Sequence, residues 1–317
     1  MRWWYRTPNE ITTCPACGSS RLRALHAVAS RKRRRASPDH RLRLVSGCDV
    51  CGLIFVNPPP TDADLAAYYA PDGGWNQREQ APWSGDKAPT DARSVPSSVT
   101  SDSALVELAV WWAARRMGTV SGLPALDYGC GRGRGLKALA EYGLHPVGLD
   151  PATAPQIRHY PMIDTLPEAP TYGLIVAKHV LEHLTNPLAI LTACRRALRP
   201  NGILAIGVPT LDGLPQHGKL SYCLNENHHV VAFTRRSLSQ LLARAGLEML
   251  AYTRRIPHRC CAIATPATSE EATAPLRDAA AALRAYRRAE AGWWAGIVPV
   301  RMWAAWDNAR RLAAPVE

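Results

Sequence analysis

The sequence predicts an α/β fold: a seven-stranded, mostly parallel sheet with helices on both faces, preceded by a small cysteine-rich module and followed by a helical C-terminal tail. Three observations lead to this prediction. Short apolar segments alternate with helical patterns from residue 104 to residue 265, a glycine-rich turn follows the first apolar segment, and two C-x-x-C pairs lie near the N-terminus. Such an alternation is typical of a parallel sheet covered on both faces.

The composition is that of a globular protein with more than one unit. With 317 residues, of which 47% are hydrophobic and 20% charged, the chain is long enough for an α/β domain and a smaller module. We divide it into a cysteine-rich module (1–70), a linker or mobile loop (71–100), an α/β domain (101–268) and a helical C-terminal extension (269–317). The linker is rich in Pro, Gly, Ser and Asp and has no apolar periodicity.

Several features bear on location and partners. The N-terminus lacks the apolar stretch of a secretion signal, and no uncharged apolar run reaches the about 20 residues of a membrane-spanning helix. Nine cysteines, an odd number, favour a reducing compartment, so we expect a cytoplasmic protein. The tail is rich in Trp and Arg, which leaves open a peripheral contact with a membrane surface beside packing onto the core. The net charge of +12 permits an anionic partner.

The individual elements follow from periodicity and end signals. Thr61 or Asp62 is a typical helix N-cap, and residues 104–117 carry apolar side chains at helical spacing. Thr234 is a second N-cap, for a helix that Gly246 ends. Strands are expected at 124–127, 146–149, 174–177, 203–208, 248–253 and 260–265, with intervening helices at 136–142 and 188–198.

The strongest chemical signal is the glycine-rich turn Leu126-Asp127-Tyr128-Gly129-Cys130-Gly131-Arg132-Gly133, between a strand and a helix. Glycine permits positive φ and close approach of the backbone to a ligand, and the helix that follows presents unpaired N–H groups. The dinucleotide pattern G-x-G-x-x-G fails, because Arg134 and Leu136 occupy its last position in the two possible registers. This is a nucleotide-binding turn of another, Rossmann-like kind.

Two carboxylates flank this turn. Asp127 precedes it, where a negative charge would repel a pyrophosphate but could accept a hydrogen bond from a cationic amino acid group. Asp150 ends the next strand, 23 residues later, where an acid can bind both ribose hydroxyls. The pair predicts a ligand with a cationic amino acid at one end and a ribose in its middle.

On these residues the sequence resembles the class I S-adenosylmethionine-dependent methyltransferases. Their first motif is matched by Asp127 to Gly133, their ribose-binding acid by Asp150, their fourth-strand motif by residues 172–184 and their fifth-strand entry by residues 198–204. The resemblance covers roughly 105–265 and implies an enzyme that transfers a methyl group from S-adenosylmethionine. The implied cofactor-binding residues are Asp127, Tyr128, Gly129, Gly131, Gly133, Asp150, Pro151, Asp164, Lys178 and His179.

The sequence departs from this family at two places. Gly173 stands where many relatives have Asp, and only 13 residues separate Asp150 from Asp164 in a Pro-rich segment. The resemblance implies a position for Asp164 near the adenine. A plain turn residue before Leu166-Pro167 is an equally good interpretation of Asp164.

The two C-x-x-C pairs predict a zinc ribbon. Cys14 and Cys17 form one pair, Cys48 and Cys51 the other, and a glycine follows each pair as expected for a turn around a metal. Four thiolates satisfy tetrahedral Zn²⁺ without an open position, so the ion would be structural. A redox role for one pair is the alternative.

Histidine is the natural candidate for taking the acceptor's proton. His183 follows the fourth strand of the predicted domain, and His228 and His229 precede the helix that Thr234 begins. We name these three as candidate bases. Capping or ion pairing is the structural interpretation of each.

The function predicted is methyl transfer to a small or carrier-linked acceptor, such as a glycan, a sugar nucleotide or a secondary metabolite. One alternative is an RNA methyltransferase that holds RNA with its zinc module and with Arg31–Arg35, which a solvated hairpin tip would also explain. The other is a degenerate, non-catalytic domain that binds partners. The acceptor itself is not encoded in a recognisable motif.

Overall fold

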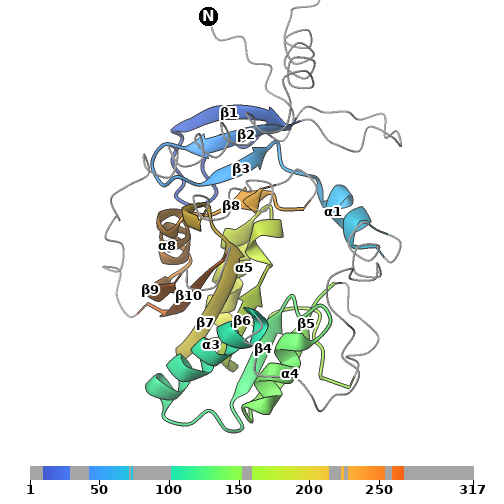
Figure 1. Ribbon diagram of the computed structural model, residues 1–317, viewed down its shortest axis with the longest axis vertical. Coiled ribbons are helices and arrows are strands. Elements are labelled where there is room, and N and C mark those ends of the chain that lie inside the picture. The colour runs from blue at the N-terminus through green and yellow to red at the C-terminus, as the bar shows by residue number, and fades with distance from the viewer. Residues whose placement is uncertain are drawn as a thin grey trace, which may run out of the picture.

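The structure is a computed structural model that describes residues 10–28, 43–70, 73, 101–151, 159–213, 223–224, 228–253 and 259–267. Two sheets organise it, a smaller one of four strands and a larger one of six (Figure 1). The Arg31–Arg35 loop, the linker apart from Gly73, and the C-terminal extension lie outside the described residues. No described helix is both long and apolar enough to cross a bilayer.

The larger sheet has the strand order β5-β4-β6-β7-β10-β9. Neighbouring strands from β5 to β7 pair in parallel, whereas β10 pairs antiparallel with both β7 and β9. The bounds confirm the predicted strands: β4 Pro124–Tyr128, β5 His145–Leu149, β6 Tyr172–Lys178, β7 Leu198–Pro209, β9 Leu247–Thr253 and β10 Arg259–Pro266.

The expected seventh strand is absent from the described residues. Beside β5 the described residues have one isolated parallel bridge, Gly148 with Met162. Gly148 donates to the carbonyl of Pro161, and Ile163 donates back to the carbonyl of Gly148, each over 2.9 Å. Pro161 has no N–H to offer the ladder, so pairing cannot extend through it. Among the described residues, pairing beside β5 is therefore limited to this bridge.

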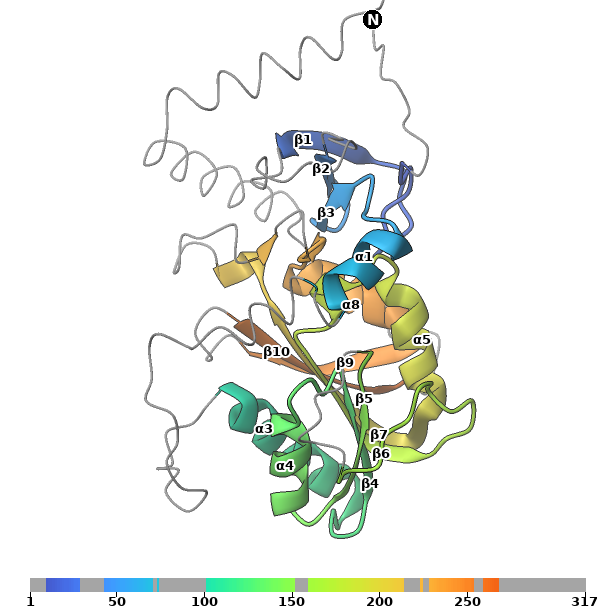
Figure 2. The same cartoon turned by 90° about the vertical axis from the view of Figure 1, so that its right-hand side faces the viewer.

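Helices cover both faces of the larger sheet, as predicted. On one face α3 (Ser101–Met117) and α4 (Arg134–Glu141) pack over Leu174, Val176 and Ala205. On the other, α5 (Pro187–Ala197) and α8 (Arg235–Arg244) pack over neighbours such as Ile175, Leu204 and Ile206. Alternate strand residues therefore serve opposite cores, as the pleat requires. Figure 2 shows α3 and α4 on one side of the strands and α5 on the other.

The predicted helix ends are present. Thr234 caps α8 in a capping box with Ser237, and Gly246 follows the helix with φ 75°. Thr61 forms the same arrangement with Asp64 at the start of α1 (Asp62–Tyr69). Each cap satisfies backbone N–H groups that the first helical turn leaves unpaired.

The smaller sheet is antiparallel and combines three N-terminal strands with a fourth from far along the chain. Its order is β1 (Leu22–Val28), β2 (Arg43–Cys48), β3 (Ile54–Asn57) and β8 (Val231–Ala232). Residues 231–232 therefore complete the sheet of the N-terminal module, although they fall within the chain segment assigned to the α/β domain.

Side chains of α8 also join the two units. Arg244 donates from Nη1 to the carbonyls of Pro15 and Ala16, over 3.1 and 3.0 Å. Thr234 Oγ1 donates to the carbonyl of Cys51 over 3.2 Å. The cysteine pairs thus rest against both ends of α8, and the smaller sheet lies above the larger one in Figure 1.

Candidate functional site

The glycine-rich turn at the end of β4 adopts a conformation that favours glycine. Gly129, Gly131 and Gly133 have φ values of 76°, 48° and 76°, in the left-handed region where a Cβ is strained. A Cβ on Gly129 would also overlap the side chain of Val180, which follows β6. The turn therefore lies directly against the segment after β6.

Asp150 holds the turn to the end of β5. Its Oδ2 accepts a hydrogen bond from the N–H of Gly131 over 2.8 Å. The N–H of Gly129 donates to the carbonyl of Leu149 over 2.7 Å. The predicted ribose-binding acid thus also fixes the shape of the turn.

Asp127 lies beneath the turn and is only 4% exposed. Its burial, together with the negative charge of Asp150, raises the pKa of the Asp127 carboxyl to about 7, although a hydrogen bond from the backbone of Leu136 works against this. A bound cation beside Asp127 would favour the ionised form.

Sequence reasoning missed Gly135, in the first turn of α4. A Cβ at this position would overlap the carboxylate of Asp127. The alternation Gly129, Gly131, Gly133, Gly135 was a visible signal, but a glycine inside a helical pattern gave no reason to expect contact with Asp127.

Gly135→Ala is expected to lower the free energy of unfolding by about 2 kcal/mol, through the overpacking that the overlap would cause. An alanine in a helix ordinarily stabilises it by up to about 1 kcal/mol, so the sign separates the overlap from helix propensity. Urea denaturation measures the difference. Lys137→Ala, on the exposed side of the same helix, should stay within about 0.5 kcal/mol of wild type. A stabilised Gly135→Ala protein would contradict the close contact.

The structure brings the remaining predicted cofactor residues to the same edge of the sheet. Tyr128 and Lys178 end β4 and β6, and burial raises the pKa of Tyr128 to about 12. Pro151 is exposed beside Asp150. Asp164, also exposed, comes directly after Ile163, whose N–H is bonded to β5. The carboxyl ends of parallel strands are where α/β sheets build ligand sites.

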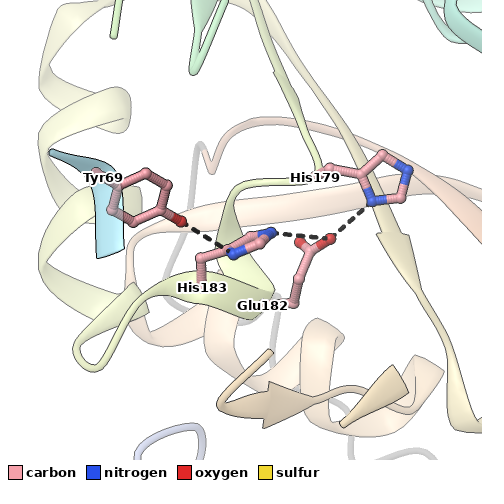
Figure 3. Close-up of polar contacts among 4 residues, drawn as sticks. All are labelled: Tyr69, His179, Glu182 and His183. Atoms are coloured by element: carbon pink, nitrogen blue, oxygen red, sulfur yellow. Dashed lines mark hydrogen bonds and ion pairs between the residues drawn. The ribbon is translucent and has the colours of Figure 1, made fainter. Parts of the chain in front are cut away.

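His179 has a left-handed backbone, with φ 54°, where β6 ends. Its Nδ1 donates to Glu182 Oε1 over 2.7 Å, and its own N–H donates to the carbonyl of Gly207 over 2.8 Å. Such a conformation costs a residue other than glycine about 1 kcal/mol or more and persists where surrounding contacts fix it. Figure 3 shows His179 beside Glu182, with His183 and Tyr69 farther along the same row of side chains.

Glu182 and His183 lie in a short 3-10 helix, Leu181–His183, with the Glu182 side chain fully buried. Burial alone would raise the pKa of Glu182, but attraction and hydrogen bonding by His179 outweigh it and lower the pKa to about 2. Burial lowers the pKa of His183 to about 4 against the opposing pull of Glu182. Glu182 is therefore an anion and His183 a neutral imidazole near pH 7.

The three histidines predicted as bases form one cluster. The ring centroid of His183 lies 5.6 Å from that of His228 and 4.8 Å from that of His229, and the latter two are 4.6 Å apart. The N–H of Val230 donates to the carbonyl of Glu182 over 2.8 Å, which ties the two histidine segments together.

Two tyrosines at the end of α1 complete this cluster and were not predicted. Tyr69 OH hydrogen-bonds with His183 Nδ1 over 3.0 Å (Figure 3), and the ring of Tyr68 stacks on His228 at 5.3 Å. Burial raises the pKa of Tyr69, and the charges of Glu182 and Asp150 add to the effect. The N-terminal module thus reaches the edge that carries Asp150.

The four predicted metal-binding cysteines also come together. Cys14 Sγ lies 3.5 Å from Cys51 Sγ, Cys17 Sγ lies 3.5 Å from Cys48 Sγ, and all four sulfurs lie within 4.8 Å of one another. Sulfurs at about 2.3 Å from a tetrahedral zinc would be about 3.8 Å apart, so this set fits the ion.

Comparison with known proteins finds similarity in part of the chain. Residues 112–252 match the family described as "Methyltransferase domain". This confirms the expected resemblance over most of the segment that the sequence motifs delimit.

Individual relatives are similar over the same part of the chain. A ubiquinone biosynthesis O-methyltransferase of Rhodopseudomonas palustris is 28% identical over 107 residues, 29% of this chain and 42% of that protein. A probable S-adenosylmethionine-dependent methyltransferase of Mycolicibacterium smegmatis is 32% identical over 101 residues, 28% of this chain and 39% of that protein. The matches span less than half the length of these curated relatives.

Among solved structures, the 1,6-didemethyltoxoflavin-N1-methyltransferase of Burkholderia thailandensis, with 1,6-didemethyltoxoflavin and S-adenosylhomocysteine bound, is similar with a TM-score of 0.46. Its sequence is 18% identical, and the likeness covers 73% of this chain and 98% of that one.

Proposed function

We propose that this protein transfers a methyl group from S-adenosylmethionine to a small or carrier-linked acceptor. The observation that carries the proposal is the glycine turn held by Asp150 at the carboxyl edge of β4 and β5, with Asp127 buried beneath it. The match of residues 112–252 to a methyltransferase domain, and relatives named as methyltransferases, support the same class.

In this proposal, different residues at the carboxyl edge of the sheet bind different parts of the cofactor. Asp127, Tyr128 and the glycines at 129, 131 and 133 would hold its amino acid end, with Lys178 and His179 nearby. Asp150 would accept hydrogen bonds from the ribose hydroxyls, and Pro151 and Asp164 would border the adenine. The cofactor supplies a methyl group activated by its sulfonium, so the chain chiefly aligns the acceptor and accepts its proton.

We assign acceptance of the acceptor's proton to the histidine cluster. A base whose pKa lies near 4 accepts a proton poorly near pH 7, which disfavours His183. His228 and His229 are the remaining candidates, and Tyr68 and Tyr69 border them. We take a hydroxyl as the accepting group, because the ubiquinone biosynthesis relatives are named O-methyltransferases.

The four cysteines are proposed to bind a structural zinc ion. The ion would hold the turns that follow each pair, where Gly18 donates to Cys14 and Gly52 to Cys48. With four thiolate ligands it has no open position for chemistry. Its effect on the site would be indirect, through α1, β8 and α8.

Asp150→Ala is expected to weaken S-adenosylmethionine binding at least about 100-fold, because each charge-assisted hydrogen bond contributes about 1.5–3 kcal/mol and the turn also loses its acceptor. Isothermal titration calorimetry measures this, with NAD as a ligand control. Glu168→Ala, an exposed carboxylate paired with Arg196, is the matched variant and should bind as wild type does. A wild-type protein that binds no S-adenosylmethionine would favour a degenerate, non-catalytic domain.

A further inference from the structure

The histidine cluster contains a second group of side chains suited to a metal ion. Glu182, His183 and His229 each offer one ligand atom, and these atoms lie within 4.8 Å of one another. Glu182 and His183 are buried, and His229 is half-buried. Ligand atoms at about 2.1 Å from an ion lie roughly 3–3.5 Å apart, so binding requires these side chains to move inward by roughly an ångström.

One carboxylate oxygen of Glu182 is available to such an ion. Its Oε1 accepts from His179, but its Oε2 is buried and has no hydrogen-bond partner among the residues that the structure describes. A carboxylate out of contact with water costs several kcal/mol unless a cation or enough donors compensate it. His179 compensates the Glu182 charge at Oε1, and a bound cation would give Oε2 a partner as well.

Surrounding side chains already orient two of the three ligands. Tyr69 hydrogen-bonds with His183 Nδ1, while His183 Nε2 lies 3.9 Å from Glu182 Oε1. His179 fixes the carboxylate of Glu182 from its other side (Figure 3). Metal ligands are characteristically held in this way by partners outside the coordination sphere.

We propose that Glu182, His183 and His229 bind one divalent transition-metal ion, at a site separate from the four cysteines. Two imidazoles and one carboxylate suit Mn²⁺, Fe²⁺, Co²⁺ or Zn²⁺. Three protein ligands leave positions open, and an oxygen of the acceptor takes one of them.

The role of this ion in methyl transfer rests on the proposed function. An acceptor hydroxyl bound to the ion becomes more acidic and gives its proton to His228. The oxygen then forms a bond to the methyl carbon of S-adenosylmethionine. The bond from that carbon to sulfur breaks with its electron pair on sulfur, which leaves S-adenosylhomocysteine.

The site is tested by titrating Mn²⁺ into protein that carries one equivalent of zinc per chain, which the four cysteines bind, and following the electron paramagnetic resonance signal of the free ion. Mn²⁺ prefers oxygen and nitrogen ligands, so a site of four thiolates does not compete for it. The wild type should bind one Mn²⁺ per chain. Glu182→Gln and His229→Gln should each weaken binding at least 10-fold, whereas Glu168→Gln should bind as wild type does.

Two variants are used in case one of them fails to fold. His229 is half-buried, so its substitution disturbs the core less than that of Glu182. Circular dichroism identifies which of them fold, and a folded variant with wild-type Mn²⁺ affinity would overturn the site. So would a wild type that binds no Mn²⁺.

Calorimetry with S-adenosylmethionine separates this proposal from the proposed function. Mn²⁺ binding without S-adenosylmethionine binding would leave the metal site standing and remove the methyltransferase. S-adenosylmethionine binding without Mn²⁺ binding would overturn the metal site and leave the proposed function standing.

Discussion

Cys51→Ser is expected to release the zinc ion and to unfold the smaller sheet. Structural zinc contributes on the order of 10 kcal/mol to small domains of this kind, which exceeds what four short strands can supply without it. Hydrogen exchange followed by mass spectrometry should show loss of protection in β1, β2, β3 and β8, and elemental analysis should show loss of zinc. Equilibration of the wild type with a chelator should give the same pattern.

The loss of protection in Cys51→Ser should extend to the histidines on the acceptor side of the site but not to the glycine-rich turn. Cys51 accepts from Thr234 at the start of α8, and β8 follows directly on His228 and His229. Exchange in 129–133 should remain as in wild type, because that turn depends on β4 and β5. Cys194→Ala, at a buried cysteine of α5, should retain its zinc. Unchanged protection of the smaller sheet in a zinc-free protein would contradict a structural role.

Asp127→Asn is expected to be more stable than wild type near neutral pH and to lose a specific pH dependence. The pKa of Asp127 is raised from 3.8 to about 7 in the folded protein. Between these values the folded state binds more protons than the unfolded state, so the free energy of unfolding falls as the pH rises. At about 1.4 kcal/mol for each pKa unit, this contribution reaches about 4 kcal/mol.

Urea denaturation at several values between pH 4 and pH 8 measures this effect. Other carboxyl groups titrate in the same range, so the informative quantity is the difference between wild type and Asp127→Asn at each pH. That difference should grow from pH 4 to pH 7 and then level off, whereas Glu168→Gln should show no such trend. A constant difference would mean that Asp127 ionises at its ordinary pKa. Asparagine can still accept from the backbone of Leu136, so the helix start is preserved.

The same linkage predicts that wild-type affinity for S-adenosylmethionine rises between pH 6 and pH 8. A cationic amino acid beside Asp127 favours the carboxylate, so binding releases a proton in this range. Calorimetry in buffers of different ionisation enthalpy measures the released proton. Asp127→Asn should release none.

Features that depend on neighbours along the chain could be predicted from the residues alone. Strand and helix positions followed from periodicity, and the Thr234 cap and the Gly246 stop followed from local backbone geometry. The turn from Asp127 to Gly133 and the two cysteine pairs are contiguous motifs, so their residue types and spacing were enough. These signals are local because the hydrogen bonds and dihedral preferences behind them join residues a few positions apart.

Contacts between distant segments are visible only in the tertiary structure. It placed β8 in the N-terminal sheet, Tyr69 against His183, and Gly135 against Asp127. It also shows six strands in the larger sheet among the described residues, where seven were expected, and a single bridge at Met162. Each of these outcomes depends on packing or on pairing between strands, which has no periodic trace in the sequence. Tyr68 and Tyr69 have an unremarkable sequence context at a helix end, and only the docking of the N-terminal module over the carboxyl edge brings them to the histidines.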